Sequence, residues 1–230
     1  MAILTCLILA VAFTGLTEAA GILPDGPLNA AVGGSVMFTT SLTEADGPFI
    51  SGIWTFNVTD FIISYNPSST DIFPNYQDRI TYVSSTASLE LRDLTMEDTG
   101  EYTVNVVPNG GGRINLDIYE KIFGVSIKAS TEQIIEGSSV TLTCEASGSS
   151  PSRTWKKDGS DLNSSENVTL SEDNTVLTFK AVKKENSGQY VCLVSNPVSS
   201  SEAKFTIVVN YGPEKVQIEG KDLINENDQI

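Results

Sequence analysis

Histidine is absent from the 230-residue sequence, and cysteine occurs only three times. The lack of histidine excludes Ser-His-Asp and Cys-His nucleophilic sites and every histidine-ligated zinc site. The 29 acidic residues lie mostly at turns and at alternating outward positions, which indicates a solvated surface rather than a pair of catalytic carboxylates. We therefore expect a protein that is not an enzyme and binds neither a metal nor a cofactor.

Basic residues are scarce in the first half of the chain. Residues 21–120 carry 13 acidic and 3 basic groups, a net charge of −10, whereas residues 121–210 carry 10 and 9, a net charge of −1. Since there is no basic patch to neutralise phosphates, we expect no nucleic-acid partner. An acidic surface mainly favours solubility, and it secondarily favours basic protein partners.

The sequence also lacks an apolar run of the roughly 20 residues needed to cross a bilayer. Its longest apolar stretch lies within residues 1–20 and ends in the small residues Ala19 and Ala20, which predicts a cleaved signal peptide at 1–20. This feature predicts entry into the secretory pathway. Membrane attachment would then require an anchor beyond Ile230, and without one the protein would be secreted.

Two similar stretches, DTGEY at residues 98–102 and NSGQYVC at 186–192, each lie between alternating apolar runs typical of β-strands. In each stretch the glycine can supply a positive φ, and the tyrosine two positions later can fold its hydroxyl back onto the corner. This pattern is typical of the turn between strands E and F of an immunoglobulin sandwich. Two copies, with Trp54 and Trp155 upstream of Tyr102 and Tyr190, predict an all-β protein of two tandem immunoglobulin-like β-sandwiches.

Residues 21–120 predict a variable-type domain, because the segment between the strands expected at 52–56 and 89–91 is long enough for extra strands. Arg79 and Asp98 occupy the positions where such domains place an ion pair across the floor of the sandwich. The two positions that would form the disulfide hold Thr40 and Val104. We therefore expect this domain to hold its sheets together by packing around residues such as Trp54.

Residues 121–210 predict a compact C2- or I-type domain. Cys144 and Cys192 lie 48 residues apart and match the bridge between strands B and F, with Trp155 placed 11 residues after the first cysteine. Such a bridge implies an oxidising, extracellular compartment and stabilises by about 4 kcal/mol in the chain-entropy estimate. Residues 211–230 are predicted to be a linker and the incomplete start of a third immunoglobulin-like domain.

Three N-x-Ser/Thr sequons begin at Asn57, Asn163 and Asn167. Together with the signal peptide and the bridge they predict an extracellular glycoprotein. Asn57 follows the same alternation as Ile53 and Thr55, so a glycan there would cover part of the neighbouring sheet surface. Either a partner contacts the part of this surface formed by the strands expected at 102–106 and 114–118, or Asn57 turns away at the end of its strand.

A variable-type domain without cysteines, followed by a disulfide-bonded C2-type domain and the joint NYGPE at 210–214, resembles the carcinoembryonic-antigen-related cell adhesion molecules. The segments NYQDRI at 75–80 and EAKF at 202–205 are also similar to the hepatocyte cell adhesion molecule. The resemblance implies adhesion through the GFCC′ face of the first domain. This name denotes the outward side of the strands expected at 114–118, 102–106, 52–56 and 61–65.

The partners implied by the resemblance are copies of the same molecule or related immunoglobulin-family surface molecules. Alternation in the sequence, counted from inward-facing Trp54 and Tyr102, assigns residues to this face. In the strand expected at 61–65, either Phe61, Ile63 and Tyr65 or Ile62 and Ser64 point outward, depending on the register of that strand. We predict a partner-binding face of Ile53, Thr55, Ile63, Tyr65, Thr103, Asn105, Val107 and Arg113. The alternative function is that of a secreted decoy or immune modulator without an adhesive role.

Overall fold

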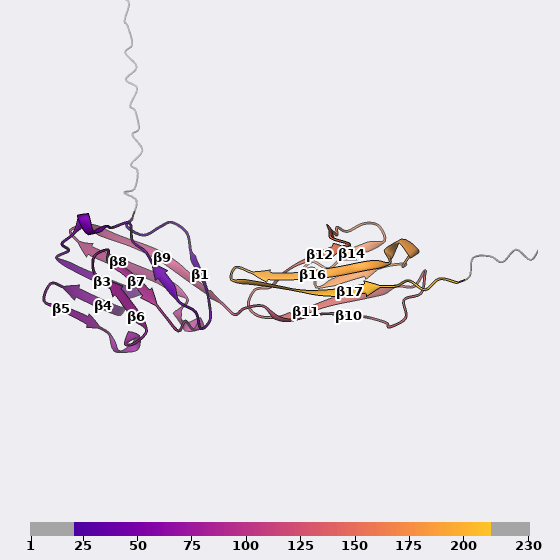
Figure 1. Cartoon of the computed structure of the whole chain (residues 1–230), viewed down its shortest axis with the longest axis horizontal. Helices are drawn as coiled ribbons and strands as arrows, with labels where there is room; N and C mark the ends of the chain where they lie inside the picture. The colour runs from indigo at the N-terminus through magenta and orange to yellow at the C-terminus, as the bar shows by residue number, and fades with distance from the viewer. Residues whose placement is uncertain (1–20, 213–230) are drawn as a thin grey trace, which may run out of the picture. The chain divides into compact units, whose positions relative to one another are not determined.

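The computed structural model describes residues 21–212, and the chain divides into two compact units between Glu120 and Lys121. The predicted signal peptide at 1–20 and the predicted third-domain start within 213–230 lie outside the described residues. Within the described part the regular secondary structure is almost entirely β-strand, arranged in two sandwiches (Figure 1). The all-β fold class expected from the sequence is confirmed.

The first unit contains a six-stranded sheet in the order β1-β9-β8-β3-β4-β5 and a three-stranded sheet in the order β2-β7-β6. Its strands are β1 (Leu28–Ala31), β2 (Val36–Phe38), β3 (Ser51–Phe56), β4 (Asp60–Asn66), β5 (Ser69–Ile72), β6 (Ile80–Val83), β7 (Ser88–Leu91), β8 (Gly100–Val107) and β9 (Gly110–Tyr119). Short 3₁₀ turns connect some of them: η1 (Glu44–Asp46), η2 (Pro74–Tyr76) and η3 (Met96–Asp98). The extra strands β4 and β5 are the feature of a variable-type domain.

The second unit contains two four-stranded sheets, in the orders β10-β11-β15-β14 and β13-β12-β16-β17. Its elements are β10 (Phe123–Ala129), β11 (Val140–Ser147), β12 (Ser152–Lys157), β13 (Ser160–Asp161), β14 (Val168–Leu170), β15 (Val176–Phe179), η4 (Lys184–Asn186), β16 (Gly188–Asn196) and β17 (Ser199–Ile207). The Cys144–Cys192 disulfide joins β11 to β16 across the two sheets, with the Cα atoms 6.4 Å apart. The predicted bridge is therefore confirmed.

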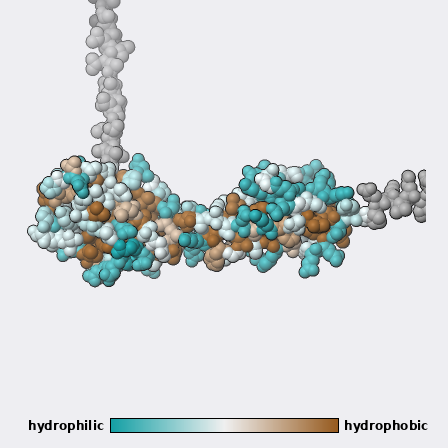
Figure 2. Space-filling model, in the orientation of Figure 1, coloured by the Kyte–Doolittle hydropathy of each residue, from teal (hydrophilic) through white to brown (hydrophobic). Residues whose placement is uncertain are grey.

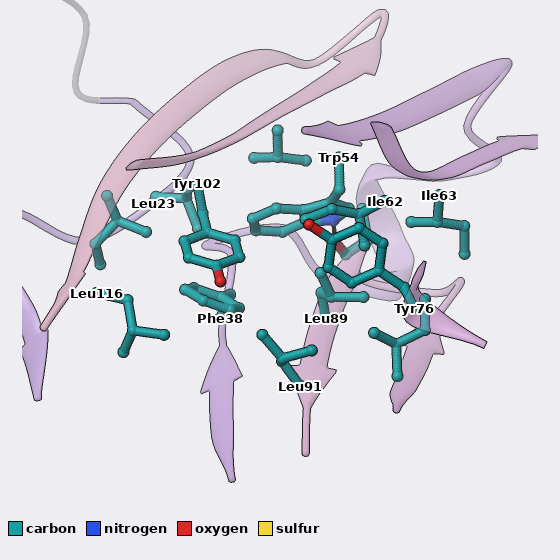
Figure 3. Packing of buried hydrophobic residues seen from close by; sticks show 14 of the residues in the cluster. Leu23, Phe38, Trp54, Ile62, Ile63, Tyr76, Leu89, Leu91, Tyr102 and Leu116 are labelled. Carbon is teal, nitrogen blue, oxygen red and sulfur yellow. Dashed lines mark hydrogen bonds between the residues drawn. The ribbon is translucent and has the colours of Figure 1, made fainter. Parts of the chain in front are cut away.

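In the first unit an aromatic cluster lies beside the two positions that would form a disulfide. The Phe38 ring stacks on Tyr102 with centroids 4.4 Å apart, and it lies 5.6 Å from Trp54 (Figure 3). All three side chains are buried, as is Val104. Offset aromatic pairs contribute about 0.5–1.5 kcal/mol beyond their area burial, so this cluster replaces part of what a bridge would supply.

Both tyrosine corners form. The Tyr102 hydroxyl donates a hydrogen bond to the Asp98 carbonyl at 2.8 Å, and the Tyr190 hydroxyl donates to the Asn186 carbonyl at 2.9 Å. Gly188 has φ of +144°, and a Cβ placed there would lie 2.7 Å from a carboxylate oxygen of Asp158. Burial raises the pKa of both tyrosines, because a phenolate would lose its solvation inside the sandwich.

The ion pair at the floor of the first unit is closely built. Arg79 Nη2 lies 2.6 Å from Asp98 Oδ2, and the Asp98 side chain is only 9% exposed. The same carboxylate oxygen accepts hydrogen bonds from the backbone N–H and the hydroxyl of Thr95. Three donors therefore satisfy one buried carboxylate, which makes the charge tolerable in this position.

Candidate interaction face of the first unit

The GFCC′ face is the outward side of β9, β8, β3 and β4, and strand register sets its residues in rows. Ile53 pairs with Asn105 on β8 and with Ser64 on β4, so these three side chains form one outward row. Thr55 pairs with Thr103 and with Phe61 in the next row, and Arg113 extends that row on β9. Val107 lies at the end of β8 and is 47% exposed. The predicted members Ile53, Thr55, Thr103, Asn105, Val107 and Arg113 are thus placed on one sheet surface.

Two predicted members of the face are wrong. Ile63 is 1% exposed and lies in the core, where Figure 3 shows it beside Ile62. Tyr65 pairs with Gly52 and packs its ring 5.6 Å from Tyr82, on the inner side of the sheet. Burial, with a smaller contribution from Tyr65, raises the pKa of Tyr82 to about 12, as expected for a phenol turned towards the core.

A β-bulge explains the error. Trp54 pairs with Ile63 while the next residue, Thr55, pairs with Phe61, so Ile62 is an extra residue in β4. Alternation therefore breaks at that point, and both isoleucines are buried. The three consecutive apolar residues at 61–63 were the available signal, since strict alternation cannot bury two neighbours in one strand.

The bulge turns Phe61 outward in place of Ile63. Phe61 is 46% exposed, and its ring stacks on Phe73 with centroids 5.3 Å apart. The apolar side chains of the face are therefore Ile53, Phe61 and Val107, separated by hydroxyl and amide groups. Figure 2 likewise shows hydrophobic residues scattered in small areas among hydrophilic ones on the visible side of the molecule.

Asn57 turns away from the centre of the face, which is the second of the two alternatives considered above. It lies in the turn between β3 and β4 with φ of +45°, a left-handed conformation that asparagine tolerates. Its side-chain oxygen accepts a hydrogen bond from the Glu101 N–H at 3.1 Å. A glycan at Asn57 would start at the end of the strand, so it would leave the rows around Ile53 accessible.

Arg113 is the positive charge of the GFCC′ face. The other two arginines of residues 21–120 pair with carboxylates, Arg79 with Asp98 and Arg92 with Glu90. Arg113 has no ion pair with any residue of 21–212, and its side chain is exposed. It borders a cavity of about 220 Å³ whose lining also includes Glu101 and Asn115.

Two β-sandwiches, each with a tyrosine corner and the second with a disulfide between its sheets, define a protein of the immunoglobulin superfamily. Residues 124–209 match the family model of the immunoglobulin I-set domain. The human hepatic and glial cell adhesion molecule is 30% identical over 189 residues, which cover 76% of this chain and 45% of the relative. The mouse HEPACAM family member 2 is 28% identical over 180 residues, which cover 72% of this chain and 39% of that relative. The chain therefore spans less than half the length of these relatives.

Solved structures show the same fold. The crystal structure of murine CEACAM1b has a TM-score of 0.67 and 23% identity, covering 80% of this chain and 96% of that chain. The crystal structure of the CD2-binding domain of CD58 has a TM-score of 0.64 and 16% identity, covering 82% of this chain and 99% of that chain. At these identities the likeness concerns the fold alone, and membership of the carcinoembryonic-antigen-related family stays a prediction from the sequence.

Within residues 21–212, no helix is long and apolar enough to cross a membrane.

Proposed function

We propose that this protein mediates cell–cell adhesion or recognition at the cell surface by binding other proteins through the GFCC′ face of its first unit. The observation that carries the proposal is the composition of that face, in which the exposed side chains of Phe61 and Val107 and the half-buried Ile53 are separated by amides, hydroxyls and one arginine. Such a mixed surface suits a reversible contact, since obligate interfaces are more uniformly apolar. The named adhesion molecules among its relatives support the same role.

Charge favours a related but different partner over an identical copy. Residues 21–120 carry a net charge of −10, so two copies of this unit repel each other. Arg113 has no ion pair within residues 21–212, and its guanidinium is therefore available to form an ion pair with a carboxylate of a partner. A partner with a less acidic surface and an acidic residue opposite Arg113 meets both conditions.

The test uses the secreted chain coupled to beads and measures bead aggregation and binding to cells that express related immunoglobulin-superfamily proteins. Ile53→Arg and Val107→Arg place a charge in the centre and at the end of the face, so we expect each to weaken binding at least tenfold. Met37→Arg is the matched control, because Met37 is 43% exposed on β2 in the opposite sheet. Binding that survives both face variants, or that is lost equally in Met37→Arg, would refute the proposal.

Sedimentation of the same chain separates the two kinds of partner. Concentration-dependent dimers that disappear in Ile53→Arg would show self-recognition. A monomer at high micromolar concentration, with cell binding intact, would show a heterophilic contact. Circular dichroism of each variant must match the parent, since a folding defect would also abolish binding.

A further inference from the structure

The three sequons differ in what their side-chain amide nitrogen does in the folded protein. N-glycosylation joins the sugar to Nδ2 of asparagine, so the bonding of that atom decides whether the fold accommodates a glycan. Asn57, Asn163 and Asn167 can be compared in this respect, because all three lie in the described part of the chain.

At Asn167 both ends of the amide are used. Nδ2 donates a hydrogen bond to the Ala181 carbonyl at 2.7 Å, and Oδ1 accepts one from the Ala181 N–H at 3.1 Å. The backbone carbonyl of Asn167 also accepts a hydrogen bond from the Lys180 N–H at 2.9 Å. Asn167 directly precedes β14, and Ala181 lies two residues after β15, so these bonds extend the pairing of the two strands, in which Val168 faces Phe179.

A glycan cannot share this arrangement. Because Ala181 both donates to Oδ1 and accepts from Nδ2, the amide uses the hydrogen that lies on the same side as Oδ1. A substituted amide is planar and trans, which places the sugar carbon on that same side. The sugar would therefore occupy the position of the donated hydrogen, and the carbonyl of the half-buried residue Ala181 would lose its donor.

At the other two sequons the nitrogen is available. Asn57 is exposed and uses only its oxygen, which accepts from Glu101, while its Nδ2 has no hydrogen-bond partner among residues 21–212. Asn163 is exposed two residues after the short strand β13, and its side chain makes no hydrogen bond within the same range. Neither residue would lose an interaction of its nitrogen on glycosylation.

We propose that Asn57 and Asn163 carry the N-linked glycans of this protein, and that Asn167 stays unmodified as a clip that joins the start of β14 to the end of β15. A chain modified at Asn167 would fold without the clip, so the folded, secreted protein is depleted of that form. The assignment rests on the extracellular location contained in the proposed function, but it does not depend on which protein is bound.

The site map is measured on the intact chain secreted from mammalian cells. Enzymatic deglycosylation in heavy-oxygen water converts each glycosylated asparagine into a mass-labelled aspartate, which peptide mass spectrometry locates. We expect the label at Asn57 and Asn163 and an unlabelled asparagine at Asn167. A label at Asn167 in folded protein would overturn the proposal, and so would its absence from Asn57 or Asn163.

Two variants separate the sequon from the clip. Thr169→Val removes the sequon of Asn167 but keeps its amide, so we expect unchanged glycan mass and an unchanged denaturation midpoint of the second unit. Asn167→Ala should also leave glycan mass unchanged, but it should lower the folding equilibrium constant of that unit roughly tenfold to thirtyfold, the loss expected for two hydrogen bonds. Trp155 fluorescence reports this unit, since the other tryptophan, Trp54, lies in the first.

Equal midpoints for Thr169→Val and Asn167→Ala would overturn the role of Asn167 as a clip. Asn163→Gln should remove one glycan without lowering the midpoint, and retention of full glycan mass in that variant would overturn the assignment of Asn163. Loss of cell binding with the expected glycan pattern would count against the proposed function alone. Absence of all glycans from a secreted, adhesive protein would count against the glycan assignment alone.

Discussion

Replacing Thr40 and Val104 together by cysteine tests whether the first unit keeps the geometry of a bridged immunoglobulin domain. Val104 pairs with Trp54 across β8 and β3, just as Cys192 pairs with Trp155 across β16 and β12. In the second unit the bridged Cα atoms lie 6.4 Å apart, within the range of about 4.4–6.8 Å that a disulfide requires. We therefore expect the double variant to form a second bridge.

The gain follows from opposing contributions. Closing a loop of 64 residues stabilises by about 4 kcal/mol in the chain-entropy estimate. The Thr40 hydroxyl now donates to the Thr86 carbonyl and accepts from the Leu42 N–H, and losing these two bonds costs about 1 kcal/mol each. Shortening the buried Val104 side chain costs about 1 kcal/mol more. The net gain is ~1 kcal/mol, which raises the melting temperature of a domain of this size by about 4–8 °C.

The assay combines free-thiol titration with thermal unfolding of the first unit, followed by Trp54 fluorescence in a Trp155→Phe background. The single variants Thr40→Cys and Val104→Cys are the controls, because they carry the losses without the bridge and should melt below the parent. Free thiols in the double variant under oxidising conditions would refute the reasoning. A bridged double variant that melts no higher than the single variants would refute it as well.

Four further perturbations have expected outcomes. Gly100→Ala should destabilise the first unit by about 1–3 kcal/mol in urea denaturation, since the new Cβ would lie 2.5 Å from Asn57 Oδ1 and 2.6 Å from the Phe56 ring. Above pH 10 the free energy of unfolding of each unit should fall by about 1.4 kcal/mol per pH unit for its corner tyrosine. Burial raises the pKa of Tyr102 and Tyr190 in the folded protein, so the unfolded chain loses the phenolic proton first. In melting curves recorded at several pH values, Tyr102→Phe should remove the contribution of one proton from the pH dependence of the first unit. An unchanged pH dependence would contradict the assignment of this effect to Tyr102. Arg79→Ala should cost about 1–2 kcal/mol, less than for a fully buried pair because the Thr95 donors remain on Asp98, and calorimetry would measure it.

The features that could be predicted from the sequence depend on short spacings. The corner glycine and tyrosine lie two residues apart, and the same segment that contains them builds the turn, so Tyr102 and Tyr190 were placed without knowledge of the rest of the fold. The bridge between Cys144 and Cys192 followed from their distance along the chain and from Trp155 between them. Alternation along β3 and β8 was regular, and it placed Ile53 and Asn105 correctly.

The features that could not be predicted depend on pairing between distant segments. The bulge at Ile62 exists because both Ile62 and Ile63 gain from burial beside Trp54. The sequence of β4 alone cannot show which residue is the extra one, because that depends on the pairing of β4 with β3. The role of Asn167 depends on Ala181, 14 residues away, whose backbone groups are presented only when β15 is in place. In the sequence this residue could not be distinguished from the other two sequon asparagines.

The two units join their sheets in physically different ways. In the second unit the disulfide restricts the unfolded chain as well as the native state, so part of its stabilisation is independent of packing quality. In the first unit the Phe38, Tyr102 and Trp54 rings act only when they are packed, because their contacts vanish on unfolding. The sheet that carries the GFCC′ face therefore depends on the cluster directly beneath it. Since Trp54 lies between Ile53 and Thr55 in β3, a loss of packing there would disturb the outward rows and the core together.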